Sequence, residues 1–289
     1  MLPLIEIDID PVIAHIGPFA LRWYSLMIMA GIYAGTIAAA RFAGQRGIDP
    51  DHVYSAAVWV VVAGIVGARL THVVDRWDLY RDQPMRVFAV YEGGIAIWGG
   101  LIGGGGAVWA YARRHGVAFW PFADAISHAA ILGQGIGRLG CIVNGDVAGR
   151  PTGADWGFVY VNPGALLPRA SYFGVPTHPY PLYELVWDFA LFGVLFWVAR
   201  TVRRDGAVFL TYAAVYSMAR LVLTMVREEE VWALGMQQAQ LVSLATIGLA
   251  GATLIVRLRA GSRASANRHV TDPAAGEVGE GTRERRLVV

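Results

Sequence analysis

The sequence predicts an all-α integral membrane protein with about seven transmembrane helices. Of its 289 residues, 55% are hydrophobic, and the mean hydropathy of +0.45 is too high for an ordinary soluble domain. The apolar residues fall in long blocks of about 20 residues, the length that crosses a hydrocarbon core of about 30 Å. A soluble α/β protein would interrupt such blocks with turns.

The candidate spans follow one another along residues 1–259, which we expect to form one transmembrane domain. The third and fourth of them are rich in glycine and less uniformly apolar than the rest. The seven spans are predicted at residues 18–40, 53–73, 87–111, 120–141, 181–200, 207–226 and 237–257.

Arginine in the loops predicts the orientation of the chain. All 24 basic side chains are arginine. Loops on the cytoplasmic side of a membrane are enriched in basic residues, which places the N-terminus outside and the C-terminus in the cytoplasm. Other arginines occupy the opposite loops, so the asymmetry is partial. The arginines that follow the odd-numbered spans are Arg41, Arg46, Arg113, Arg114, Arg200, Arg203, Arg204, Arg257, Arg259 and Arg263.

Three segments lie outside the predicted spans. The N-terminal residues before the first span carry acids and no basic cluster, so we expect them on the outer surface rather than as a signal peptide. Residues 142–180 form an extracytoplasmic loop, long enough to carry structure of its own. Residues 260–289 are polar and without apolar periodicity, which predicts a disordered cytoplasmic tail.

Several charged groups fall inside the predicted spans, where each costs a few kcal/mol. Paired structural charges are one explanation, but the whole set favours a shared polar cavity. Two guanidiniums in it, those of Arg138 and Arg220, would suit an anionic headgroup such as a phosphate. The set comprises Arg69, Asp124, His128, Arg138, Glu184, Asp188 and Arg220.

Other patterns point away from common functions. The glycine run at residues 98–110 lacks the Lys-Ser/Thr of a phosphate-binding loop and favours close helix packing. Cys141 has apolar neighbours and is expected to be a small buried hydrophobe. The seven histidines are scattered, so we expect no metal and no cofactor. A net charge of +2 gives no reason to expect a nucleic-acid partner.

The stretch GQGIGRLGCIVNGDVAGRPT, residues 133–152, resembles the signature of the bacterial prolipoprotein diacylglyceryl transferases. That signature has a Gly-Gln, then Gly-Arg-x-Gly-Asn-x-x-Asn-Gly-Glu, then a Gly-Arg. Other stretches resemble family motifs in the family's order along nearly the whole chain. They are PFALRWYSLM (18–27), GARL (67–70), GGIAIWGGLIGG (93–104), HPYPLYE (178–184) and YSMARLVLTMVRE (216–228).

The resemblance implies an enzyme of the bacterial cytoplasmic (inner) membrane. The family moves the diacylglyceryl group of phosphatidylglycerol onto the lipobox cysteine thiol of a preprolipoprotein and releases glycerol phosphate. This reaction is the first step of lipoprotein maturation. The expected partners are therefore phosphatidylglycerol, preprolipoprotein signal peptides and the lipid bilayer. Because the attacking thiol belongs to the substrate, the enzyme needs no nucleophile of its own.

The resemblance also implies roles for single residues. Arg138 matches the signature arginine expected to bind the headgroup. Arg220 matches a second arginine expected to contact the phosphate or leaving group, and Asp146 occupies the position of the signature glutamate. Residues expected to line the substrate site are Tyr24, Trp98, Asn144, Gly149, His178, Tyr183, Glu184 and Tyr216.

Three positions depart from the family pattern. Trp98 stands where many members have histidine, Cys141 replaces an asparagine, and Thr224 replaces an acid. These departures remove the most obvious base, so the thiol proton would go to Asp146, to His178 or to water.

Other functions remain open at this point: a divergent paralogue with another lipid or acceptor, a non-catalytic lipid-binding protein, or a small transporter. A transporter would be expected to show internal repeats, and the sequence has none of fixed period. A homologue without activity should have lost its arginines first, yet Arg138 and Arg220 are present.

Overall fold

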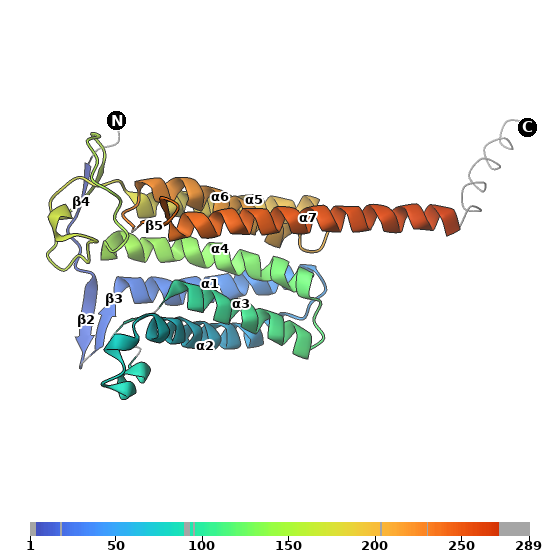
Figure 1. Ribbon diagram of the computed structural model, residues 1–289, viewed down its shortest axis with the longest axis horizontal. Coiled ribbons are helices and arrows are strands. Elements are labelled where there is room, and N and C mark those ends of the chain that lie inside the picture. The colour runs from blue at the N-terminus through green and yellow to red at the C-terminus, as the bar shows by residue number, and fades with distance from the viewer. Residues whose placement is uncertain are drawn as a thin grey trace, which may run out of the picture.

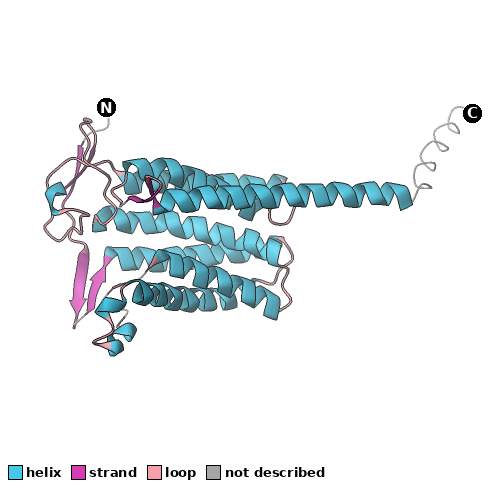
Figure 2. Ribbon diagram, in the orientation of Figure 1, coloured by secondary structure: helices cyan, strands magenta, loops and turns pink. Residues whose placement is uncertain are grey.

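The computed structural model is a bundle of long helices with short strands gathered at one end, which we call the strand end (Figures 1 and 2). The structure describes residues 4–17, 19–89, 93–94, 96–202, 204–229 and 231–271, with side chains as far as Arg257. The seven helices are α1 (Trp23–Gln45), α2 (Pro50–Asp75), α3 (Ile97–Arg114), α4 (Phe119–Asn144), α5 (Tyr180–Thr201), α6 (Ala207–Leu223) and α7 (Gln238–Thr271).

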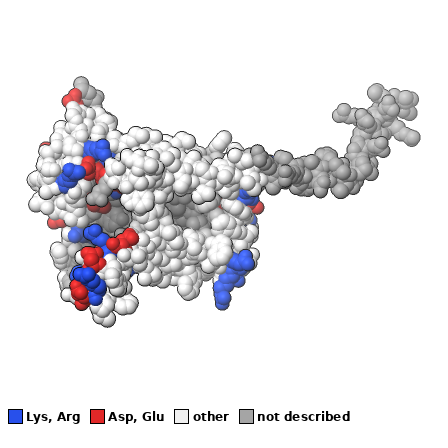
Figure 3. All heavy atoms as spheres, viewed as in Figure 1, with Lys and Arg blue, Asp and Glu red and all other residues white. Residues whose placement is uncertain are grey.

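The helical membrane fold predicted from the sequence is confirmed. Among the described residues, 6 helices are long and apolar enough to cross a membrane, namely all of those above except α3. Figure 3 shows a matching pattern on one face, where charged side chains gather toward the ends of the bundle and the middle carries few charges. The count of seven spans and the sidedness of the termini stay predictions.

The third helix begins ten residues later than the predicted span of 87–111, and Arg69 of α2 gives the reason. Its guanidinium, 5% exposed, donates hydrogen bonds to backbone carbonyls of the link that precedes α3. Irregular backbone between membrane helices is tolerated where protein groups satisfy its hydrogen bonds. The link includes the short 3₁₀ helix η2 (Pro84–Phe88), and the carbonyls belong to Arg86, Val87, Ala89, Gly93 and Gly94.

The first helix also begins later than predicted, at Trp23 instead of residue 18. Residues Phe19–Arg22 form β3, which pairs with β2 (Val12–Ile16) in an antiparallel hairpin. Before it, β1 (Leu4–Ile7) pairs in parallel with β4 (Gly157–Tyr160), so the N-terminal segment is joined to the 142–180 loop. That loop therefore has structure of its own, as predicted.

Short elements complete the strand end. They are η1 (Trp77–Leu79), η4 (Ala170–Tyr172), η5 (Thr224–Val226), β5 (Val231–Ala233) and β6 (Met236–Gln237). The last two form a hairpin that leads into α7. Helix α7 continues to Thr271 and so includes the first part of the predicted tail at 260–289, while residues 272–289 lie outside the described residues.

Small residues let the helices approach closely. A Cβ atom added to Gly31 of α1 would lie 2.9 Å from the carbonyl oxygen of Gly133 on α4, and one added to Gly35 would lie 2.7 Å from that of Ala129. Backbones this close leave no room for a methyl group. Within the glycine run, Gly99 contacts Gly67 of α2 in the same way, which confirms the predicted packing role there.

We expect Gly35→Ala to destabilise the protein by about 1–3 kcal/mol, the usual cost of overpacking. The added methyl group would meet the backbone of Ala129, which cannot turn away as a side chain can. The matched control is Gly105→Ala in α3, where nothing lies within 4 Å of the added atom. Thermal unfolding in detergent should show a lower Tm for Gly35→Ala only. Equal Tm values would contradict the tight contact between α1 and α4.

Candidate active site

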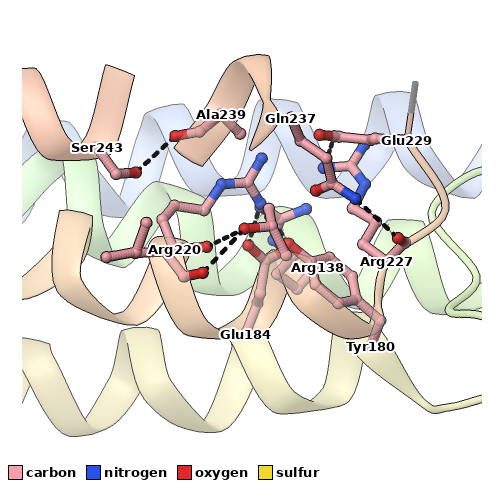
Figure 4. A network of polar contacts seen from close by, with 11 residues as sticks. Arg138, Tyr180, Glu184, Arg220, Arg227, Glu229, Gln237, Ala239 and Ser243 are labelled. Atoms are coloured by element: carbon pink, nitrogen blue, oxygen red, sulfur yellow. Dashed lines mark hydrogen bonds and ion pairs between the residues drawn. The ribbon is translucent and has the colours of Figure 1, made fainter. Parts of the chain in front are cut away.

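Three charged side chains from different helices meet near the strand end. Arg138 of α4 forms an ion pair through Nη2 with Oε2 of Glu184 on α5, at 2.7 Å. Arg220 of α6 forms an ion pair through Nη1 with the other oxygen of the same carboxylate. Figure 4 shows Glu184 pointing toward both guanidiniums, with Tyr180 beside it. We call Arg138, Glu184 and Arg220 the charged trio.

The trio is largely shielded from solvent. The side chain of Glu184 is 4% exposed, and those of Arg138 and Arg220 are 15% and 18% exposed. One carboxylate cannot neutralise two guanidiniums, so the trio by itself carries a net positive charge. A guanidinium has five N–H donors, of which the contact with Glu184 uses only a part. The trio is therefore suited to an anion with several acceptor oxygens, such as a phosphate.

Tyr180 supports the trio from the first turn of α5. It is fully buried, and its hydroxyl accepts a hydrogen bond from Nη1 of Arg220 at 2.5 Å. A further guanidinium, that of Arg227, lies over its ring at 5.4 Å. The sequence interpretation missed Tyr180. The available signal was its position four residues before Glu184, which places both side chains on one face of a helix.

The segment after α4 brings the signature residues to the same end of the bundle. Gly145, with φ +80°, ends the helix in the left-handed conformation that glycine adopts without strain. The side-chain amide of Asn144 then donates to Asp146 at 2.8 Å. Asn144 is buried and Asp146 is exposed, so the pair joins the bundle interior to the surface.

Gly149 is held between two other segments. Its backbone N–H donates to the carbonyl oxygen of His178 at 3.2 Å, and it forms a β-bridge with Arg227. A Cβ atom at this position would lie 2.7 Å from the Cβ of His178, so a side chain does not fit. Gly149 thus fastens the loop after α4 to the starts of α5 and of the link after α6.

His178 and Tyr183 form an aromatic group with Trp156. Nδ1 of His178 lies 3.4 Å from the hydroxyl of Tyr183, and the centroids of the Trp156 and Tyr183 rings are 5.7 Å apart. Both His178 and Tyr183 are half-buried. Because Tyr183 directly precedes Glu184 on α5, this group is close to the charged trio along the chain.

Two more predicted residues lie beside the trio. Tyr24 of α1 packs against the buried cluster of Cys141, Val147 and Tyr180, where it experiences the charge of Arg138. Tyr216 lies one turn before Arg220 on α6, and its ring stacks on that of Tyr212 at 5.7 Å. Cys141 is buried, as predicted.

Trp98 takes a separate place. It lies half-buried in the first turn of α3, the helix that packs mainly against α2. The buried hydroxyl of Thr224 donates to the carbonyl oxygen of Arg220 at 2.5 Å. Two of the three departures from the family pattern, Cys141 and Thr224, therefore lie beside residues of the trio, and the third, Trp98, lies at the start of α3.

The single polar cavity expected for all intramembrane charges is wrong. Asp124 lies at the opposite end of the bundle, where its carboxylate accepts from the backbone N–H groups of Gly206 and Phe209, each at 2.8 Å. It thus caps the start of α6. His128 stacks on Phe42, with ring centroids 3.5 Å apart. These charges, like Arg69, serve local structure, and the trio stands apart from them.

Comparison with known proteins places the sequence in a family. A family model described as prolipoprotein diacylglyceryl transferase matches residues 11–257. A relative from Trichormus variabilis is 36% identical over 258 residues, covering 86% of this chain and 91% of its own length. One from Gloeobacter violaceus is 38% identical and covers 83% of this chain and 89% of its own. A third, from Dehalococcoides mccartyi, is 33% identical and covers 91% of this chain and 100% of its own. All three are named phosphatidylglycerol–prolipoprotein diacylglyceryl transferase.

Removing the carboxylate of the trio should strongly destabilise the fold. In Glu184→Ala, two largely shielded guanidiniums would lose the carboxylate that pairs with both of them, and breaking such an arrangement costs about 3–5 kcal/mol. The control is Asp205→Ala, whose ion pair with Arg46 spans 3.5 Å at a 54% exposed carboxylate and contributes about 0–1 kcal/mol. Tm values of the purified variants test the contrast. A Tm loss in Glu184→Ala no larger than in the control would contradict the buried pairing.

Proposed function

The chain belongs to the prolipoprotein diacylglyceryl transferase family, and from this membership we propose that it modifies preprolipoproteins. The proposed reaction transfers the diacylglyceryl group of phosphatidylglycerol to the lipobox cysteine thiol, the first step of lipoprotein maturation. The observation that supports it best is the convergence of Arg138 and Arg220 on one buried carboxylate.

The chemistry of the reaction needs this kind of site. A carbon–sulfur bond forms, the carbon–oxygen bond next to the phosphate breaks, and glycerol phosphate leaves as an anion. Fixed positive groups that face the developing negative charge lower the barrier of such a step. We assign Arg138 to the lipid phosphate and Arg220 to the same phosphate or the leaving group, because both are held in place by Glu184.

The remaining predicted residues form the proposed surroundings of the substrate. Tyr24 and Tyr216 flank the trio within the bundle, and Asn144 and Gly149 shape the segment after α4. Asp146, His178 and Tyr183 lie toward the surface, where the lipobox peptide would arrive. Asp146 and His178 are the two side chains that the sequence suggests as proton acceptors, and Trp98 lies in the first turn of α3.

The membrane setting fits both substrates. Phosphatidylglycerol and a signal peptide both reside in a bilayer, so they can reach a helical bundle from the side. We propose that the protein lies in the bacterial cytoplasmic membrane with its strand end outside. The arginine-rich loops, which end α1, α3 and α5 at the opposite end of the bundle, support this orientation.

The first test is complementation of bacteria depleted of their own transferase, combined with an assay of membranes containing phosphatidylglycerol and a lipobox peptide. We expect growth and a thioether-linked diacylglyceryl group on the peptide. A folded protein that binds phosphatidylglycerol without modifying the peptide would favour the alternative of a lipid-binding protein. A product carrying another lipid would favour a divergent paralogue.

We expect Arg138→Gln to lower kcat by about 10²–10³-fold, the usual loss when one fixed donor to a developing anion is removed. Arg169→Gln is the matched control, since that side chain is 63% exposed and pairs with Glu228 at the surface. Both variants are compared at equal amounts of folded protein. Equal rates for Arg138→Gln and the wild type would mean that the signature arginine has been assigned wrongly.

Trp98→His restores the residue that many family members carry. If the missing histidine limits proton transfer, kcat should rise, and its increase should follow the deprotonation of an imidazole near pH 6.5. Phenylalanine at position 98 serves as the control for the loss of the indole ring. An unchanged rate in Trp98→His would place the proton acceptor elsewhere.

A further inference from the structure

One buried acid beside the charged trio has no hydrogen-bond partner in the part of the chain that the structure describes. Asp188 lies one turn after Glu184 on α5 and is 1% exposed, and neither of its carboxylate oxygens accepts a hydrogen bond there. Asp124, at 2% exposure, accepts two backbone hydrogen bonds. A buried carboxylate without such partners is costly and calls for a reason.

The surroundings of Asp188 connect it to the trio. Helix α4 packs against it at Gly135, where an added Cβ atom would lie 3.4 Å from the Cβ of Asp188. Positions four residues apart on a helix share one face, so Asp188 and Glu184 are neighbours. The ionisable groups that face Asp188 from the packed helices are Arg138 of α4, Glu184 of α5, and Tyr212, Tyr216 and Arg220 of α6.

A bound phosphate would change the charge balance around the trio. With Asp188 included, two guanidiniums balance two carboxylates. A lipid phosphate that binds the guanidiniums adds one negative charge and takes hydrogen bonds away from Glu184. Two adjacent carboxylates without full pairing cannot both stay ionised in a shielded site, because like charges there repel strongly. Uptake of one proton restores the balance.

We propose that Glu184, in place of Asp146 or His178, accepts the proton of the lipobox thiol once the lipid phosphate occupies Arg138 and Arg220, and that Asp188 makes this transfer favourable. The inference rests on the proposed function. Glu184 would be the catalytic residue, and Asp188 a positioning residue that acts through it. The like charge of Asp188 repels a negative charge at Glu184, and both side chains are buried.

The step balances as follows. The S–H bond breaks and its proton goes to Glu184, while the sulfur forms a bond to the terminal glyceryl carbon. The bond from that carbon to the phosphate oxygen breaks, and its electron pair leaves with glycerol phosphate. The proton then passes from Glu184 to the departing phosphate. Both carboxylates are then ionised again and balance the two guanidiniums.

The test compares wild type, Asp188→Asn and Asp188→Glu in the thioether assay, with saturating phosphatidylglycerol and peptide across a range of pH. Glu184 must be unprotonated to accept a proton. The wild-type kcat should therefore fall toward low pH with a one-proton slope, and we call this part of the pH profile the acid limb. Asp188→Asn removes the like charge beside Glu184. The acid limb of Asp188→Asn should therefore move to lower pH, and its neutral kcat should fall about 10–100-fold with the weaker base.

The variants separate this role from a structural one. Asp188→Glu keeps the charge and should keep the position of the acid limb. Asp82→Asn makes the same substitution at an 82% exposed carboxylate and should leave both rate and limb unchanged. If Asp188→Asn does not fold, Asp188→Ser, with a small neutral hydroxyl, takes its place. A lower rate with an unmoved acid limb, or no change at all, would overturn the inference. An inactive wild-type protein would instead overturn the proposed function, and this inference with it.

Discussion

The pairing of one buried carboxylate with two guanidiniums determines how three helices sit against one another. Glu184 comes from α5, Arg138 from α4 and Arg220 from α6, and none of the three charges can be left alone in a shielded interior without a cost of several kcal/mol. Turning any of these helices about its axis would break the set. The contacts that hold these helices in place thus also hold two positive groups at one point of the bundle. Stability and anion recognition depend on the same atoms.

The rest of the bundle makes this placement possible through close backbone contacts. Gly31 and Gly35 allow α1 to lie directly on α4, while Gly67 and Gly99 do the same for α2 and α3. Apolar packing between helices has little driving force in lipid, so short distances between backbones are what hold such pairs together. In this arrangement α4 is central, because it contacts α1, α5 and α6 and carries Arg138.

Much of this could be predicted from the sequence. Hydrophobic length identified the helices to within a few residues in most cases, and the signature around residues 133–152 identified the segment that carries Arg138. The predicted start of α3 was wrong because hydropathy does not reveal that Arg69 donates hydrogen bonds to the carbonyls of the preceding link. The shared cavity was wrong for a related reason. A buried charge such as Asp124 can cap a distant helix, and only the three-dimensional contacts tell a cap from a site. Tyr180 was missed because only the folded structure shows that its hydroxyl accepts a hydrogen bond from Arg220.

The parallel pairing of β1 with β4 affects the order in which the protein is built. Residues 4–7 leave the ribosome well before their partners, residues 157–160, which follow four complete helices. Chains fold progressively from the N-terminus during synthesis, and pairings between distant segments form late. The strand end therefore closes only after α4, with Arg138, has been inserted. Until then the N-terminal strand waits unpaired at the membrane surface, an exposed edge that any other strand nearby could occupy.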